Sequence, residues 1–267
     1  MEKNTLCDSW GLSLADWAIP DSILSQAPIS PWQLSPERFG PTQARTASPT
    51  VIKIKELLDL AVKPADRIIM DVGCGAGGIS LLLLDHVNSI TAVDISEKML
   101  DAYRASFEAA RKSDVAIRLV PGSWLSVYDD AGTAGVVVCA NVLYNVPTPC
   151  EFISKLDEAA TLGVVLEIHE RHPHSVANGA WKHFWGLERP SEPTGKQLLE
   201  IVESLGISAH SSTFYRNPER RREVDDDLVQ AIRERVCLDP SRDDEVRAFL
   251  LDNPAEQIES RLIWWVK

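Results

Sequence analysis

The sequence predicts an α/β fold with a doubly wound sheet of seven mostly parallel strands. Short unbroken apolar runs alternate with segments whose apolar residues recur at helical spacing, as in a parallel sheet covered by helices on both faces. A glycine-rich turn follows the first of these runs, where a doubly wound sheet holds its ligand. The 267 residues, 45% of them hydrophobic, can form a core large enough for one such domain with an added cap.

The first 48 residues differ from this alternating pattern. Trp10, Trp17, Trp32 and Phe39 lie among five prolines, which break the segment into short helical pieces. Two roles are compatible with this composition: a strap packed on the core, or a lid whose aromatic side chains cover a ligand pocket. The expected divisions are therefore a strap or lid at 1–48 and a core domain at 49–267 with a cap-like insertion at about 171–193.

From residue 49 onward the elements can be assigned in order. Strands are expected at 67–72, 89–94, 115–120, 135–140, 163–168, 207–215 and 259–266. Helices are expected at 51–62, 76–86, 96–111, 149–160, 194–205, 219–236 and 243–251, with Ser96 as the cap of the third. The last two strands are not joined by a single crossover helix, so one strand near the C-terminus is expected to run antiparallel.

Composition and charge argue against two classes of partner. Lys and Arg number 27 against 39 Asp and Glu, which gives a net charge of −12 and a pI near 5.0. Because phosphate neutralisation needs clustered basic side chains, we expect no nucleic-acid partner. The longest apolar runs, 81–84 and 136–140, are far shorter than the roughly 18 residues that cross a bilayer, so no membrane partner is expected.

The cysteines and the first residues favour a cytoplasmic protein. Five cysteines are scattered without CxxC or other metal-type spacing, which predicts reduced thiols and no metal site. Residues 1–10 carry charged side chains and lack an apolar signal core.

The most informative stretch is the glycine-rich turn after the first expected strand. Gly73, Gly75 and Gly78 satisfy G-x-G-x-x-G, and Asp94 follows about 20 residues later at the end of the next strand. Glycines allow a ligand to approach the backbone closely, and a carboxylate at that distance accepts hydrogen bonds from both ribose hydroxyls. This context predicts a ligand that contains a nucleoside.

Asp71 narrows the choice of nucleoside. Its carboxylate, two residues before Gly73, would repel a pyrophosphate but suits a ligand with a cationic ammonium group. S-adenosyl-L-methionine carries an ammonium, a sulfonium, a ribose and an adenine, and no phosphate. The position of Asp71 therefore favours this methyl donor over a dinucleotide.

With Asp71 followed by Gly73, Gly75 and Gly77, the sequence resembles the class I S-adenosylmethionine-dependent methyltransferases. The stretch from Ser96 to Leu100 is similar to the branch that acts on small molecules. The resemblance covers about residues 49–169 and implies a Rossmann-like sheet and S-adenosyl-L-homocysteine as the product. It implies that Asp71 contacts the methionine ammonium, usually through water, and that Asp94 holds the ribose. The residues placed at the cofactor are Asp71, Gly73, Cys74, Gly75, Gly77, Asp94, Ile95, Met99, Ser123, Trp124 and Asn141.

The third strand departs from the family pattern. Members of the family usually end this strand in Gly-Asp, whose aspartate reaches the adenine amino group, whereas this chain has Gly122 and Ser123. Ser123 can accept one hydrogen bond without the added strength of a charged acceptor, and Trp124 is expected to pack on the adenine face.

Candidate catalytic residues follow the fourth and fifth strands. Asn141 to Tyr144 stand where amino-methyltransferases of nucleic acids and proteins have Asn-Pro-Pro-Tyr, but both prolines are missing. Tyr144 is therefore interpreted as a wall of the acceptor pocket, with a core-facing aromatic residue as the alternative. His169 and His172 are candidate general bases, and a solvated polar loop is the alternative for this histidine-rich stretch. Pro173 opposes a helical zinc motif there.

Three functional hypotheses result. The first is in-line methyl transfer from S-adenosylmethionine to a small molecule, in which the enzyme mainly positions the acceptor behind the methyl. The second is an NAD-dependent oxidoreductase with the same glycine fingerprint. The third is a regulatory protein that binds the cofactor without catalysis.

Overall fold

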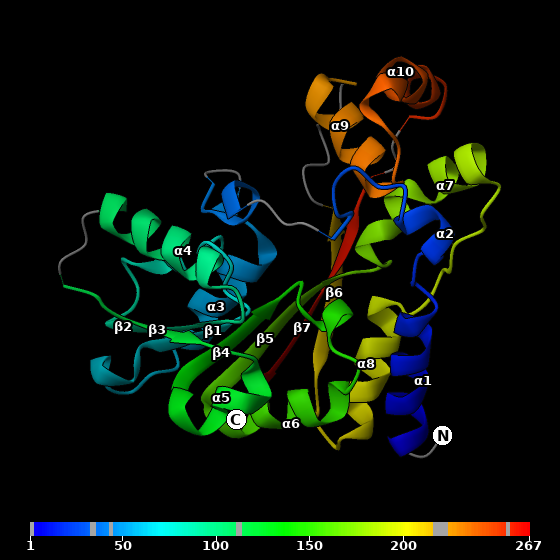
Figure 1. The fold of residues 1–267 in the computed structure, drawn as a ribbon. Coiled ribbons are helices and arrows are strands. Elements are labelled where there is room, and N and C mark those ends of the chain that lie inside the picture. Colours follow the sequence, from blue (N-terminus) through cyan, green and yellow to red (C-terminus); the bar gives the residue numbers. More distant parts are fainter. Residues whose placement is uncertain (1–2, 33–35, 43–44, 111–113, 216–223, 255–256) are drawn as a thin grey trace.

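The computed structural model describes residues 3–32, 36–42, 45–110, 114–215, 224–254 and 257–267, and its centre is a seven-stranded sheet (Figure 1). The strand order is β3-β2-β1-β4-β5-β7-β6, with β7 antiparallel to both neighbours and the remaining pairs parallel. The strands are β1 Ile68–Val72, β2 Ser89–Asp94, β3 Ala116–Pro121, β4 Ala134–Ala140, β5 Ala160–His169, β6 His210–Tyr215 and β7 Glu259–Val266. The predicted fold class and the antiparallel strand near the C-terminus are confirmed.

Helices cover both faces of the sheet and bury its apolar side chains in two separate cores. One core lies between the sheet and the helices α1 (Lys3–Ala15), α5 (Trp124–Ala131), α6 (Pro149–Ala159) and α8 (Gly195–Ser204). The other lies between the sheet and the helices α3 (Pro49–Leu58) and α4 (Glu97–Ala110). The central strands β1 and β4 are buried on both faces, which explains why their sequences are apolar without alternation.

A third apolar core belongs to a helical cap beyond the sheet. It contains side chains of α7 (Asn178–Trp185), α9 (Asp226–Arg235) and α10 (Asp243–Asp252), among them Trp181 and Ile232. The cap therefore combines two insertions, one between β5 and α8 and one between β6 and β7. Figure 1 shows these three helices grouped together above the end of β6. The sequence predicted only the first insertion as a cap.

Two expected elements need correction. The helix predicted at 76–86 is instead a series of turns around the 3₁₀ segment Ser80–Leu83, and the positive φ of Gly77 (89°) is incompatible with a regular helix there. Helix α5 was not predicted, although Ser123 stands at its N-cap position. The other expected helices and strands are present within a few residues of their predicted limits. The start of the helix expected at 219–236, with Arg220 to Arg222, lies outside the described residues.

The N-terminal segment packs along the sheet rather than standing free. Helix α1 contacts α6 and α8, and Trp10 donates a hydrogen bond from Nε1 to the Val146 carbonyl at 3.1 Å. Cys7 of α1 and Cys150 of α6 form a disulfide, with Cα atoms 6.0 Å apart. The expectation of five reduced thiols is therefore wrong for these two cysteines. None of the described helices is long and apolar enough to cross a membrane.

Candidate active site

The glycine loop lies where β1 ends, next to the ends of β2 and β4. Gly73, Gly75 and Gly77 all have positive φ angles (73°, 54° and 89°), which side-chain-bearing residues rarely adopt. A Cβ on Gly73 would also collide with the side chain of Val142, just after β4. These three predicted positions are therefore fixed by backbone geometry, and the loop presents backbone instead of side chains to a ligand.

Asp94, at the end of β2, is bound to the glycine loop. Its Oδ2 accepts a hydrogen bond from the Gly75 backbone N–H at 2.8 Å, and its Oδ1 accepts one from Ser96 N–H at 2.9 Å. Each carboxylate oxygen retains acceptor capacity. The side chain is only partly buried, so this capacity can serve the two hydroxyls of a ribose. These features fit the nucleoside expected at this position.

Asp71 lies deeper than Asp94, at the centre of a buried polar network. It is 2% exposed and accepts a hydrogen bond from Ser80 Oγ at 2.6 Å, while Tyr103 Oη lies 3.0 Å from the same Ser80 oxygen. Burial raises the pKa of Asp71 from 3.8 to about 6, and the hydrogen bonds from Ser80 oppose that rise. A cation bound nearby would favour the charged carboxylate, as expected for a partner of the methionine ammonium.

The other residues predicted at the cofactor occupy different environments. Cys74 and Met99 are buried, and burial raises the pKa of the Cys74 thiol far above its usual value. Ile95 is 76% exposed beside Asp94. Their contacts with a cofactor remain predictions.

The end of β3 presents the weakest part of the predicted adenine site. Ser123 is exposed, and its hydroxyl donates to Ser126 Oγ at 2.8 Å. Trp124 is 3% exposed, because its ring packs against Tyr128 and Phe152 and its Nε1 donates to the Phe152 carbonyl at 3.3 Å. These contacts within the protein are enough to explain the burial of Trp124, so its stacking on adenine remains a prediction.

Asn141, at the end of β4, is held in a fixed orientation. Its φ is +61°, and its Nδ2 donates to Glu167 Oε1 at 3.2 Å. Glu167 also accepts a hydrogen bond from Thr50 Oγ1 at 2.5 Å, and it is 3% exposed. Because a carboxylate accepts and does not donate, the amide nitrogen of Asn141 must face Glu167. Asn141 Oδ1 is buried without a hydrogen-bond partner among the described residues, so it is available to a donor on a ligand.

Two of the three predicted catalytic residues, Tyr144 and His172, lie in one cluster of rings, whereas the Nδ1 of His169 lies 3.1 Å from Ser260 Oγ. Tyr144 is 5% exposed and donates to the His169 carbonyl at 2.8 Å. Its ring lies 5.7 Å from Trp10 and 4.9 Å from His172, and His172 stacks on Trp17 at 4.0 Å. The side chains of the N-terminal segment therefore pack directly on the ends of β4 and β5.

Trp10 and Trp17 are buried, as expected for a strap packed on the core, whereas Trp32 is exposed. Trp10 and Trp17 are 2% and 3% exposed, and Trp17 Nε1 donates to the Glu192 carbonyl at 2.6 Å. Trp32 is 44% exposed and lies 4.8 Å from the His174 ring. Residues up to Trp17 thus fix the segment in place, and the part near Trp32 remains a candidate lid.

The imidazoles of His169 and His172 are kept neutral by their surroundings. Burial and nearby arginines lower the pKa of His169 to about 4 and the pKa of His172 to about 3. His172 Nδ1 accepts a hydrogen bond from the His174 backbone N–H at 3.2 Å, so the neutral ring carries its proton on Nε2. Such weak bases accept protons poorly at neutral pH, which favours a positioning role over general-base catalysis.

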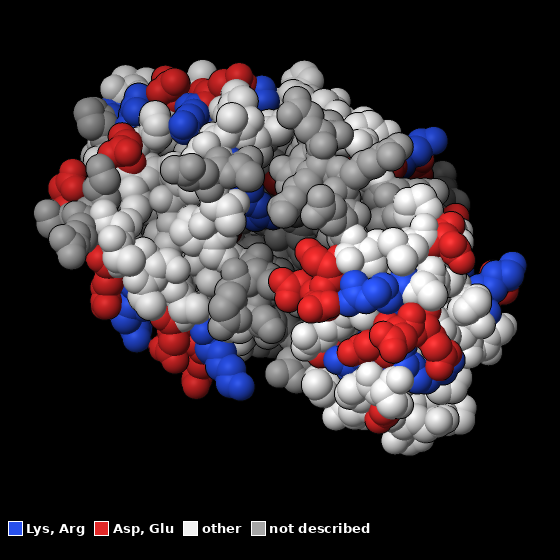
Figure 2. All heavy atoms as spheres, turned by 90° about the horizontal axis from the view of Figure 1, so that it is seen from above, with Lys and Arg blue, Asp and Glu red and all other residues white. Residues whose placement is uncertain are grey.

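The face that carries these residues is hollowed. Figure 2 looks down on this end of the molecule and shows a hollow between the sheet part and the cap, with basic side-chain atoms visible inside it. Trp181, Phe184 and Trp185 pack within the cap: Trp181 lies in its core, Phe184 packs against Phe249, and Trp185 donates a hydrogen bond from Nε1 to the Val236 carbonyl.

Sequence reasoning missed four residues of the site: Arg45, Ser80, Tyr103 and Thr50. Ser80 and Tyr103 complete the Asp71 network, and Thr50 donates to Glu167. A Cβ built on Gly78 would lie 3.1 Å from Arg45 Nη1, which brings this guanidinium to the glycine loop. No spacing signal marks these residues, because each reaches the site through tertiary packing.

Comparison with known proteins agrees with this geometry. Residues 69–161 match the family model of a methyltransferase domain. The chain is 33% identical over 122 residues to ribosomal RNA small subunit methyltransferase A of Corynebacterium jeikeium, a match that covers 44% of this chain and 37% of that relative. It is 29% identical over 218 residues to glycine N-methyltransferase of Rattus norvegicus, covering 76% of this chain and 71% of that relative.

A solved structure of loganic acid methyltransferase with S-adenosylhomocysteine superposes with a TM-score of 0.55 at 12% identity, covering 84% of this chain and 92% of the other. This likeness concerns the fold. Residues 69–161 therefore match a methyltransferase domain, and the strand order is that of the Rossmann-like class I methyltransferase fold that the sequence predicts. The match favours a methyltransferase over the NAD-dependent oxidoreductase, which stays an alternative to be tested by cofactor binding.

Proposed function

We propose that the protein transfers a methyl group from S-adenosylmethionine to a small-molecule acceptor by in-line displacement. The observation that carries the proposal is the arrangement of Asp94 and Asp71 around the glycine loop, within the segment that matches the methyltransferase family. Bound S-adenosylmethionine would supply an electrophilic methyl on its sulfonium. The chain would hold the nucleoside through Asp94 and the ammonium end near Asp71, and would position the acceptor.

The acceptor is proposed to bind between the cap and the ends of β4 and β5. Asn141 Oδ1 offers one fixed hydrogen-bond acceptor there, and Tyr144 and His172 offer ring surfaces. The weakly basic histidines favour an acceptor that is nucleophilic without deprotonation by the protein, such as a neutral amine or a carboxylate. Glycine N-methyltransferase and loganic acid methyltransferase, by their names, act on acceptors of these two kinds.

A small molecule is favoured over RNA despite the match to a ribosomal RNA methyltransferase. That match covers 37% of the relative's length, and the chain carries a net charge of −12, which opposes binding to phosphates. We also propose that the protein acts in the cytoplasm as an enzyme, in preference to a regulator that only binds the cofactor.

The first experiment is calorimetric titration of the purified protein with S-adenosylmethionine, S-adenosylhomocysteine and NAD. Binding of the first two without NAD is the expected result, and binding of NAD alone would overturn the proposal. A second experiment incubates the protein and S-adenosylmethionine with panels of amines, carboxylates and phenols, and in parallel with ribosomal RNA, and measures S-adenosylhomocysteine release. Release with RNA alone would contradict the small-molecule assignment. Cofactor binding with no acceptor modified in any panel would favour the regulator.

A further inference from the structure

The segment that precedes α3 passes directly over the glycine loop. A Cβ built on Gly78 would lie 2.7 Å from the Phe39 carbonyl oxygen and 3.2 Å from the Gly40 carbonyl oxygen. A Cβ on Gly75 would lie 3.1 Å from Phe39 Cβ. We call residues 36–42 and 45–48 the crossing segment. The last glycine of the fingerprint thus makes room for protein backbone, since any side chain at Gly78 would push the crossing segment away.

Arg45 lies on the crossing segment, and its guanidinium reaches the same glycine. A Cβ on Gly78 would be 3.1 Å from Arg45 Nη1. Among the described residues, no hydrogen bond or ion pair of this guanidinium is found. Asp71 is the acid whose charge acts on it, but the Asp71 carboxylate is hydrogen-bonded to Ser80.

The environment of Arg45 is unfavourable for an unpaired cation. The side chain is partly buried, and burial lowers the pKa of its guanidinium while the charge of Asp71 raises it. A desolvated cation without a bonded anion is costly, and an anionic ligand offsets that cost. Guanidinium groups bind carboxylates with two parallel hydrogen bonds, which adds both strength and orientation.

The charges of Asp71 and Arg45 at the glycine loop suit a zwitterionic ligand group, which has one positive and one negative charge. Asp71 and Arg45 have opposite charge and act on each other electrostatically across the glycine loop. The amino-acid end of S-adenosylmethionine has one ammonium and one carboxylate. We infer that Arg45 binds the carboxylate of this amino-acid end, so that the crossing segment is part of the cofactor site. This inference rests on the proposed function.

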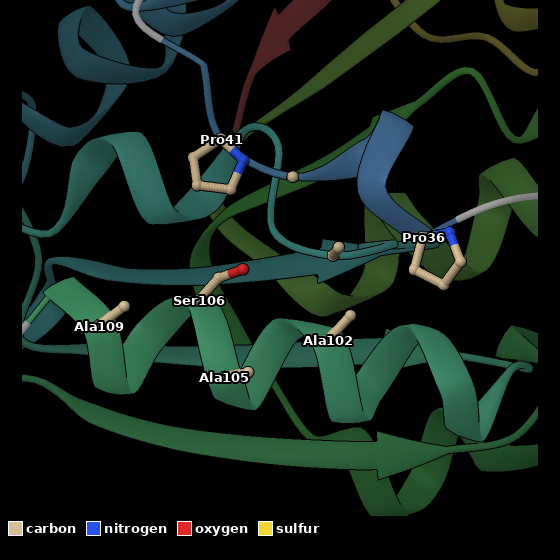
Figure 3. Close-up of a pocket in the computed structure, with 8 residues that line it drawn as sticks. Pro36, Pro41, Ala102, Ala105, Ser106 and Ala109 are labelled. Atoms are coloured by element: carbon tan, nitrogen blue, oxygen red, sulfur yellow. The ribbon is translucent and has the colours of Figure 1, made fainter.

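The crossing segment is tightly packed on the loop and loosely packed beside it. Figure 3 shows a groove between Pro36 and Pro41 on one side and α4 on the other, with the small side chains Ala102, Ala105 and Ser106 along α4. Its volume is about 430 Å³.

The test compares two ligands that differ only in the carboxylate. S-adenosylhomocysteine and its decarboxylated analogue are titrated calorimetrically into the wild-type protein, into Arg45→Ala and into Arg45→Lys. The wild type is expected to bind S-adenosylhomocysteine at least tenfold more tightly than the analogue. Arg45→Ala should lose that preference and keep the wild-type affinity for the analogue within about twofold. Arg45→Lys should retain part of the preference.

Arg67→Ala is the matched control. Arg67 forms an exposed ion pair with Asp59 at 3.0 Å, so its removal should change neither affinity. Equal loss of both ligands in Arg45→Ala would indicate a structural role and overturn the inference, as would unchanged binding of S-adenosylhomocysteine. Failure of the wild-type protein to bind S-adenosylhomocysteine would instead contradict the proposed function.

Discussion

Asp94 is hydrogen-bonded to the backbone of Gly75: its Oδ2 accepts the Gly75 N–H at 2.8 Å across the gap between β2 and the glycine loop. Its second oxygen accepts the Ser96 N–H, just before the start of α4, at 2.9 Å. One carboxylate therefore fixes the loop and the helix start before any ligand binds. A ribose would add its hydroxyls to a preorganised acceptor and would not need to order it.

Replacing Asp94 by alanine should weaken cofactor binding. The variant loses charged hydrogen bonds to the ribose, worth about 2–3 kcal/mol, which corresponds to a dissociation constant raised roughly 30- to 150-fold. Calorimetric titration with S-adenosylhomocysteine measures the change.

Asp101→Ala provides the matched control for Asp94→Ala. Asp101 lies exposed on α4 in an ion pair with Arg104, so its loss should leave the dissociation constant unchanged. A wild-type constant in Asp94→Ala would refute the ribose role.

The part of the site that could be predicted from sequence is the part made by consecutive residues. The turn after β1 and the acid at the end of β2 stand at fixed spacings, since a strand, a turn and a helix start determine where Gly75 and Asp94 lie. Arg45 and Tyr103 reach the same loop from segments far away in the sequence, and no local pattern records such an approach.

The fold, like the site, could be predicted only where consecutive residues determine the structure. Apolar runs located the seven strands, but the helical pattern at 76–86 did not become a helix, because Gly77 takes a left-handed backbone conformation. The extent of the cap was also missed, since α10 is recognisable as a helix but its packing against α7 through Phe184 and Phe249 depends on tertiary structure.

Asp71→Asn should stabilise the protein at high pH while weakening the cofactor site. Burial raises the pKa of Asp71 in the folded state to about 6, above the unfolded value of 3.8, so the folded state holds the extra proton between these values. Stability from this group is therefore present below about pH 4 and is lost as the pH rises through 6. At pH 8 the free energy of unfolding of Asp71→Asn should exceed that of the wild type by about 3 kcal/mol. This is the free-energy equivalent of the rise in the pKa of Asp71 from 3.8 to about 6.

Urea unfolding at pH 4 and pH 8 checks this prediction. The difference between Asp71→Asn and the wild type should nearly vanish at pH 4, where the buried wild-type carboxyl is itself protonated. The same difference at both pH values would show that the substitution acts through packing and not through titration.

The buried histidines should make the protein less stable in acid, which is opposite to the effect of Asp71. Burial, with Arg45, Arg235 and Arg189 nearby, lowers the pKa of His169 to about 4 and that of His172 to about 3. The unfolded state binds these protons first, so the stability is complete above about pH 6.5 and is lost as the pH falls toward 3. His172→Gln, which cannot be charged, should lose less stability over this range in urea unfolding. His86→Gln, of a histidine outside the ring cluster, is the comparison and should keep the wild-type slope.

Thr50→Val should destabilise the fold through Glu167. The substitution keeps the shape of the side chain and removes the hydrogen bond from Thr50 Oγ1 to the buried Glu167 Oε2. Loss of a donor to a buried charged group costs about 1–3 kcal/mol, measured as the free energy of unfolding in urea. Thr213→Val on the exposed edge strand β6 makes the same chemical change without burial and should cost little. Equal effects of the two substitutions would show that the Thr50 bond contributes nothing specific.

The bond between Cys7 and Cys150 should make thermal stability depend on redox conditions. It closes 143 residues of chain and ties α1 to the start of α6, so it restricts the unfolded ensemble, and bonds of this type typically add about 2–4 kcal/mol. Reduction of the wild type should lower its melting temperature by several degrees, whereas Cys150→Ser should start at the lower value and not respond to reductant. Cys139→Ser serves as the control for thiol loss, since Cys139 is a buried free thiol in β4 and its variant should keep the response. A wild-type melting temperature that is the same with and without reductant would show that the bond contributes no stability.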